Sequence, residues 1–107
     1  MLGLARRAGR LFAGTETVVS ALKRGRVDLV VMAVDLSPAT KERLARLAAA
    51  RGVQILTVGN REALARATGC PGRGVYGVAG HELAAKIASS LASLREAEMV
   101  EGGDKDS

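Results

Sequence analysis

Apolar residues along this chain form short continuous runs that alternate with stretches of helical spacing. The run at residues 29–34 is rich in β-branched side chains and shows no polar alternation, which is typical of a central strand buried on both faces. Residues 53–58 and 75–78 predict two further strands, and the brief segment 11–13 is expected to be extended. The pattern therefore predicts a four-stranded sheet.

Helical spacing fills the segments between these strands. A helix from about Thr15 to Arg24 is followed by Gly25, a residue suited to a left-handed helix end. Ser37 and Pro38 are a favourable cap and first turn for a helix that reaches about Arg51. The remaining expected helices are a short one near residues 2–8, one from Asn60 through Ala67, and a last one opening at Gly80 or His81 with Leu83, Ile87, Leu91 and Leu94 as its apolar stripe.

Alternating helices and strands predict an α/β fold, a three-layer α/β/α sandwich around a mixed sheet. One domain is expected over residues 1–97. Residues 98–107 lack the hydrophobicity needed to fold, so a disordered acidic tail is expected there. The chain has 107 residues, 48% of them hydrophobic, which is enough for one core.

The composition narrows the partners and the compartment. One Phe, one Tyr and no Trp exclude a broad aromatic platform for single strands. A single cysteine, Cys70, excludes an internal disulfide and a multi-cysteine zinc site, which favours the reducing cytoplasm. No apolar run approaches the roughly 20 residues that span a bilayer, so no membrane partner is expected. Arg6, Arg7 and Arg10 stand where an export signal would be apolar.

The net charge of +5 is unevenly distributed. Residues 1–26 hold six basic residues against Glu16 alone, whereas the rest of the chain holds ten of each sign. Residues 96–107 carry a net charge of −4, so the body without them carries +9. This clustering favours a polyanion-binding surface over a set of solvated faces.

Catalytic motifs are not expected. His81 is the only histidine and fits a helix cap or a surface position, and Cys70 has no activating base nearby in the sequence. Asp28 and Asp35 lie at opposite ends of the central strand, so they cannot act as a close carboxylate pair. The glycine-rich segment 69–74 lacks the Lys-Ser or Lys-Thr of a P-loop. We therefore expect no enzyme activity, no metal and no cofactor.

Two glycine-containing turns, at Gly14 and at residues 69–74, are expected at strand ends, where open α/β sheets bind ligands. An ordinary helix entry explains Gly14 alone, and an ordinary turn explains the second segment alone. Spacing does not show whether the two turns meet. A helix start that offers backbone N–H groups suits a phosphate or a base edge, which makes RNA the first partner to test.

The order of Gly14-Thr15, then Leu22-Lys23-Arg24-Gly25, then the strand at 29–35 resembles the L7Ae/L30e ribosomal protein superfamily. Residues 2–10 look closest to its bacterial YlxQ-like branch, and residues 62–69 match a further segment of the family. The resemblance spans about residues 2–92, almost the whole expected domain.

The resemblance implies an L30e-like fold and kink-turn RNA binding without catalysis or cofactors. In the family, the helix that starts at this glycine recognises the guanines of sheared G·A pairs, and the loop before the last strand covers an extruded nucleotide. The positions implied are Gly14, Thr15, Glu16, Thr17 and Ser20 for the helix, Cys70, Pro71, Gly72, Arg73, Gly74 and Val75 for the loop, and Lys23, Arg24, Arg10 and Arg73 for phosphates. The implied partner is structured RNA, ribosomal RNA included, bound by a cytoplasmic monomer associated with the ribosome.

Three positions depart from the family pattern. Glu16-Thr17 replaces the archaeal Asn-Glu, and Ser20 replaces a lysine. Loss of one bidentate-class contact costs about 1–3 kcal/mol, or roughly ten- to hundredfold in affinity. Glu16 and Ser20 leave open a protein-interaction module that kept the fold and lost RNA recognition. A further alternative is a nucleic-acid-binding accessory domain detached from an RNA-modifying enzyme.

Overall fold

The computed structural model describes residues 9–69 and 74–90. The expected helix near residues 2–8, the loop residues Cys70 to Arg73, the end of the last apolar stripe at Leu91 and Leu94, and the acidic tail lie outside this part. The elements are β1 (Leu11–Ala13), α2 (Thr15–Lys23), β2 (Leu29–Met32), α3 (Pro38–Arg51), β3 (Gln54–Thr57), α4 (Arg61–Thr68), β4 (Val75–Val78) and a helix that occupies residues 81–90.

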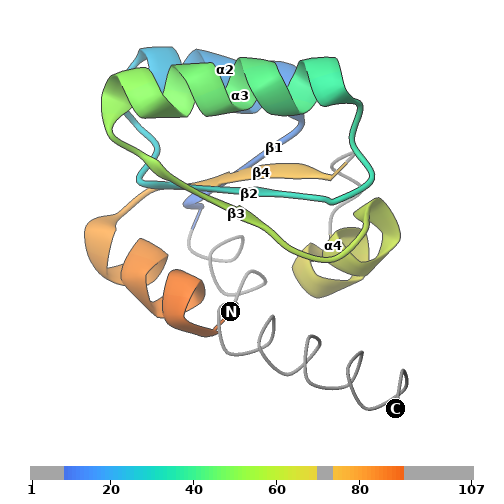
Figure 1. Cartoon of the computed structure of the whole chain (residues 1–107). Helices are drawn as coiled ribbons and strands as arrows, with labels where there is room; N and C mark the ends of the chain where they lie inside the picture. Colours follow the sequence, from blue (N-terminus) through green and yellow to red (C-terminus); the bar gives the residue numbers. More distant parts are fainter. Residues whose placement is uncertain (1–8, 70–73, 91–107) are drawn as a thin grey trace, which may run out of the picture.

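The strands form one mixed sheet in the order β1-β4-β2-β3. The β2–β3 pair is parallel, and β4 pairs antiparallel with both β1 and β2. Helices α2 and α3 cover one face of this sheet, and α4 with the helix at 81–90 covers the other (Figure 1). The predicted three-layer α/β/α sandwich with a four-stranded mixed sheet is confirmed.

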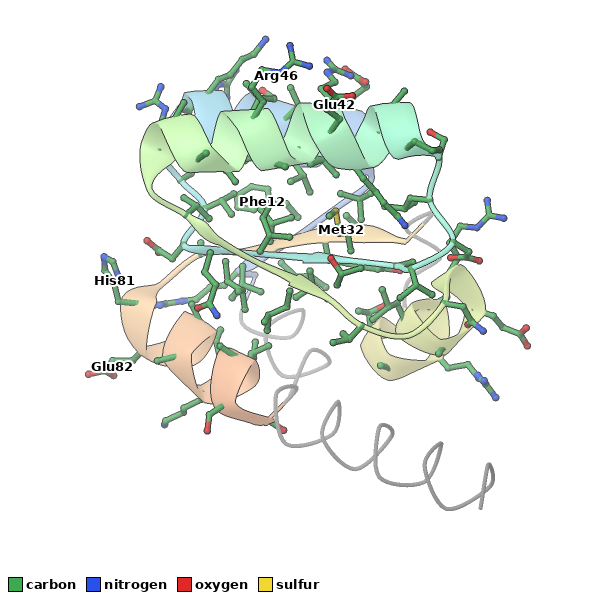
Figure 2. All side chains as sticks on the ribbon, viewed as in Figure 1. Phe12, Met32, Glu42, Arg46, His81 and Glu82 are labelled. Carbon is green, nitrogen blue, oxygen red and sulfur yellow. The ribbon has the colours of Figure 1, made fainter. Side chains whose placement is uncertain are left out.

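The core lies on both faces of the sheet because successive strand residues point to opposite sides. Val30 and Met32 of β2 pack toward α2 and α3 with Leu44, and Met32 is labelled in Figure 2. Leu29 and Val31 pack toward the other layer. All four residues of β2 are buried, as the uninterrupted apolar run predicts.

The predicted strand at 29–34 is two residues too long. After Met32 the backbone leaves the ladder: the Ala33 N–H donates to the Gly74 carbonyl at 2.8 Å, and the Val34 N–H donates to the Gly59 carbonyl at 2.8 Å. These bonds join the end of β2 to the turns before β4 and α4. Val34 is half exposed as a result, at 52%.

Local sequence signals define the helix ends. The Ser37 and Asn60 side chains accept hydrogen bonds from the third residues of α3 and α4. At the end of α2, Gly25 adopts φ +69°, which lets its N–H donate to Leu22 and the Arg26 N–H donate to Ala21. This pair of bonds is a Schellman motif, and it ends α2 at Lys23 with Arg24 as its cap.

Candidate functional site

The Gly14 turn and the described end of the second predicted turn, Gly74 with Val75, lie at one end of the sheet. The Gly14 N–H donates to the Val75 carbonyl at 2.9 Å, directly beyond the β1–β4 pair of Ala13 and Tyr76. Gly74, the residue before β4, accepts from Ala33 at the end of β2. The start of α2 and the start of β4 are therefore neighbours, which the sequence could not establish.

Gly14 has a backbone that other residues rarely adopt. Its φ of +100° and ψ of 150° fall in a region almost restricted to glycine. No side chain caps α2 at this residue. The first N–H groups of the helix, from Thr15 onward, have no acceptor within the helix. This turn can therefore present backbone donors to a ligand.

Gly74 is crowded as well as strained. Its φ is +84°, and a Cβ there would lie 2.6 Å from Cγ of Arg61 and 2.9 Å from Cβ of Ala33. The Arg61 stem thus lies directly on the last residue of the predicted loop. Arg61 was not among the predicted site residues, because only the folded chain brings the start of α4 beside the start of β4.

Asp35 fixes Arg61 in this place. Its carboxylate accepts from the Arg61 backbone N–H at 3.0 Å and from Nε at 3.3 Å. Desolvation raises the pKa of Asp35, but the hydrogen bonds from Arg61 outweigh it and leave the pKa below its ordinary value. The carboxylate is therefore ionised at neutral pH and holds the arginine at the end of the sheet.

A hollow of about 390 Å³ follows one side of α2 and contains several predicted site residues. Thr17, Ser20 and Arg24 are spaced three or four residues apart, so they share one side of the helix. The lining consists of Phe12, Glu16, Thr17, Ser20, Ala21, Arg24 and Arg26. Phe12 and Arg26 were not among the predicted site residues, although Arg26 follows the helix-ending glycine and was counted in the basic cluster.

Glu16 is paired with an arginine from the neighbouring helix. Arg43 of α3 donates to both carboxylate oxygens, at 2.8 Å and 3.4 Å. The hydrogen bond and the charge of Arg43 lower the pKa of Glu16. The negative charge that departs from the family pattern is thus balanced within the protein. Arg43 was also missed, because nothing in the sequence places it beside α2.

The other predicted phosphate-binding residues lie elsewhere. Arg10 is at the opposite end of β1 from Gly14, where its carbonyl accepts from Ala79. Lys23 is the last residue of α2, and its carbonyl accepts from the Arg51 guanidinium. The hollow does not include either residue. Cys70, Pro71, Gly72 and Arg73 lie outside the described residues.

Three further features of the described part of the chain concern metal binding, the place of His81 and membrane spanning. Residues 9–69 and 74–90 contain no cluster of three or more His, Cys, Asp or Glu side chains that could hold a metal ion. His81, expected as a cap or surface residue, is exposed and lies 3.5 Å from Asp28 (His81 is labelled in Figure 2). Within these same ranges no helix has the length and apolar character needed to cross a bilayer.

Comparison with known proteins identifies similar chains. The profile of the ribosomal protein L7Ae/L30e/S12e/Gadd45 family matches residues 1–87. An RNA-binding protein from Bacillus pumilus is 39% identical over 62 residues, which cover 58% of this chain and 76% of that protein.

Two solved structures are also similar. A protein of unknown function from Bacillus halodurans C has a TM-score of 0.80 and 37% identity, covering 85% of this chain and 92% of that one. The Giardia lamblia 15.5kD RNA binding protein has a TM-score of 0.71 and 20% identity, covering 90% of this chain and 82% of that one, and it shows the shared fold alone.

Proposed function

The chain belongs to the ribosomal protein L7Ae/L30e/S12e/Gadd45 family, and we propose on this premise that it binds structured RNA of the kink-turn class. The RNA contacts the end of the sheet where α2 and β4 begin. The similarity to the Bacillus pumilus RNA-binding protein supports an RNA ligand.

The observation that carries this proposal is the contact between the Gly14 turn and Val75. It places the backbone N–H groups of the first turn of α2 beside the segment that leads into β4. Thr17 and Ser20 add hydroxyl groups that line the hollow beside α2. One ligand can therefore contact both segments, as recognition of paired guanines together with an extruded nucleotide requires.

The arginines at this end of the sheet support an anionic ligand. Arg61 lies against Gly74, where its exposed guanidinium suits a phosphate of the nucleotide at the loop. Arg43 offsets the charge of Glu16, so this carboxylate can accept a hydrogen bond from a base amino group with less repulsion from nearby phosphates. Ser20 stands where the family pattern has a lysine, so it carries no positive charge. Arg43, from the neighbouring helix, is a basic side chain close to the first turn of α2.

Association with the ribosome is part of the proposal, because the family includes ribosomal proteins. The protein is proposed to bind as a monomer in the cytoplasm, since one copy presents both the Gly14 turn and the segment before Val75. We propose no catalytic step, because the site consists of backbone donors, hydroxyls and ion-paired side chains.

The test is a titration of the protein against a standard kink-turn RNA and against the same RNA with its sheared G·A pairs replaced. Loss of base contacts worth about 1–3 kcal/mol predicts a roughly ten- to hundredfold weaker Kd for the second RNA. Equal affinity would exclude specific kink-turn recognition. Absence of binding to both RNAs at low salt would favour the protein-interaction alternative.

A further inference from the structure

The outer edge of β3 is open in the part of the chain that the structure describes. β3 is the last strand in the sheet order, and within residues 9–69 and 74–90 it pairs with β2 alone. It runs in front of β2 and below α3 in Figure 1. An edge strand presents backbone N–H and C=O groups with which a further strand can pair. This edge can therefore accept another strand.

Two residues of β3 direct their backbone groups away from β2. Successive residues of a strand direct their N–H and C=O groups to opposite sides. The Val58 N–H donates to the Met32 carbonyl of β2 at 3.1 Å, which sets the alternation. Ile55 and Thr57 therefore point outward, and no hydrogen bond within the described ranges uses their outward groups. The open edge offers two donors and two acceptors.

The sequence of β3 lacks the devices that block strand addition. Natural proteins protect edge strands with charged residues, with Pro or with bulges. Residues 53–60 contain no Asp, Glu, Lys, Arg or Pro. The other edge strand, β1, differs, because it follows Arg10 and borders the hollow lined by Glu16, Arg24 and Arg26. Of the two edges, β3 is thus the one suited to pairing.

The side of α3 above this edge consists of small residues. Arg43 points toward α2, where it pairs with Glu16. By helical spacing, Ala45 and Ala49 lie on the opposite side of α3, above the edge of β3. The charged residue on this side, Lys41, donates from Nζ to a backbone carbonyl of its own chain at 2.6 Å. A second sheet can therefore approach β3 without meeting bulky or free charged side chains.

The outward groups of β3 are complementary to a second copy of themselves. A contact about a two-fold axis joins the same patch of both copies. Antiparallel pairing of Ile55 with the partner's Thr57, and of Thr57 with the partner's Ile55, uses all the outward donors and acceptors. Leu56 then lies at the axis, and the α3 helices of both copies lie on the same side of the joined sheet.

α3 carries matching charges near this axis. Leu56 is three residues, or about 10 Å, along β3 from Val53. α3 runs back over β3 in the opposite direction (Figure 1), and about seven residues of helix cover the same distance, which places Ala45 near the axis. Glu42 and Arg46, labelled in Figure 2, are exposed on either side of this point, and the ion pairs of the described residues involve neither. Antiparallel α3 helices bring Glu42 toward the partner's Arg46.

We propose that two copies of this chain associate through antiparallel pairing of their β3 strands, which joins two four-stranded sheets into one. The sheet ends at which α2 and β4 begin then point in opposite directions, so both Gly14 turns stay free. One copy suffices for the RNA contacts proposed above, and pairing is a separate equilibrium that depends on protein concentration. Because the contact is small, the pair forms at high concentration.

The first test measures amide hydrogen exchange by NMR and mass by sedimentation equilibrium, over a concentration series of the full chain without RNA. The mass should rise toward twice that of one chain, and the Ile55 and Thr57 amides should gain protection as it rises. Leu11 and Ala13 are the internal control. They point outward from β1, because Arg10 and Gly14 bond to β4 and its flanking residues, and their exchange should not change.

The second test removes one outward donor from each copy. Thr57→Pro deletes an N–H that points away from β2, so the β2–β3 ladder keeps its hydrogen bonds. Loss of this donor in both copies removes two of the proposed hydrogen bonds, which should weaken the pair roughly ten- to hundredfold. Thr57→Val retains the N–H and should pair as the wild type does.

The third test uses substitutions on the surface of α3 that do not depend on how β3 tolerates Pro. Ala45→Lys places like charges beside the axis and should weaken the pair. Ala50→Lys makes the same charge change on the side of α3 toward α2 and should leave pairing unchanged.

The inference is overturned if the wild type keeps the mass of one chain at every concentration, a result that would leave the edge to an extended segment of another protein. Protection at Leu11 and Ala13 in place of Ile55 and Thr57, or equal weakening by both lysine substitutions, would also overturn it. Because no arm contains RNA, none of these results depends on the proposed function.

Discussion

Substitution of Gly14 gives the clearest prediction, because an ordinary helix entry and a strained turn predict opposite changes in the free energy of unfolding. It is the cap residue of α2, and asparagine is among the best residues at a helix cap. At an ordinary helix entry, Gly14→Asn would therefore stabilise the protein by a few tenths of a kcal/mol. The observed φ of +100° and ψ of 150° predict the opposite.

The cost comes from the backbone alone. A Cβ at Gly14 would meet only the Thr17 hydroxyl, at 4.0 Å, so no steric clash contributes. Forcing a non-glycine residue into this region costs about 1–3 kcal/mol. We expect Gly14→Asn to lower the free energy of unfolding by that amount, or the melting temperature by roughly 4–8 °C for each kcal/mol.

Gly52 is the matched control. It also has a positive φ, +66°, but its ψ of 29° places it in the left-handed helical region, which asparagine tolerates. A Cβ there would meet nothing within 4 Å. Gly52→Asn should therefore cost less than about 1 kcal/mol.

Urea unfolding measures both variants, with the midpoint reporting the change while the m-value stays constant. A Gly14→Asn protein as stable as the wild type, or more stable, would refute the strained turn. Equal losses for Gly14→Asn and Gly52→Asn would refute the distinction between their conformations.

The remaining predictions concern the core, a helix cap and the ion pair beside the site. Leu44→Ala removes a fully buried side chain under α3 and should cost about 2–5 kcal/mol in urea unfolding; a loss below 1 kcal/mol would contradict this packing. Asn60→Ala removes the cap of α4 and should cost about 0.5–2 kcal/mol in the same assay, and no change would show that the cap is not formed. Arg43→Gln should return the pKa of Glu16 toward its ordinary value in an NMR titration; an unchanged pKa would exclude the pair in solution. Because the folded-state pKa of Glu16 is lowered, the pair stabilises the protein above the unfolded-state pKa near 4. The difference in unfolding free energy between wild type and Arg43→Gln should therefore disappear as the pH falls through the folded-state pKa. A difference that widens in acid would contradict the assignment.

The sequence predicts those parts of the fold that local chemistry determines. Ser37 with Pro38, and Asn60, mark helix starts because their side chains act within three residues. Gly25 and Gly52 mark helix ends because both need a positive φ. The apolar run at 29–34 identifies a buried strand, and only the bonds from Ala33 and Val34 to distant turns shorten it.

The site depends on contacts between segments that are distant in the sequence, and local sequence patterns do not predict such contacts. The pairing of β1 with β4 brings Gly14 to Val75, and no local pattern selects β4 as the partner of β1. Packing of α2 against α3 brings Arg43 to Glu16, although an isolated Glu16 suggests an unbalanced charge. Arg61 reaches the site for the same reason.

The family resemblance indicates candidate RNA-binding residues, and the structure shows which of them lie close together. Thr17, Ser20 and Arg24 share one hollow with Glu16. Arg10 is at the other end of β1. The basic residues of the first 26 positions therefore do not form one patch. A further group of basic residues lies on α3. The net charge of the sequence does not reveal this group, because acidic residues elsewhere in the chain offset it.

The most direct test of the proposed site is a map of the backbone amides that respond to a kink-turn RNA, obtained from NMR chemical-shift changes of the labelled protein. We expect the largest changes in the N-terminal part of α2, from Thr15 to Ser20, and at Val75, with little change at residues 82–86, which lie at the other end of the sheet and in the other helical layer. Changes concentrated on the helix at 81–90, with the start of α2 unaffected, would contradict the site.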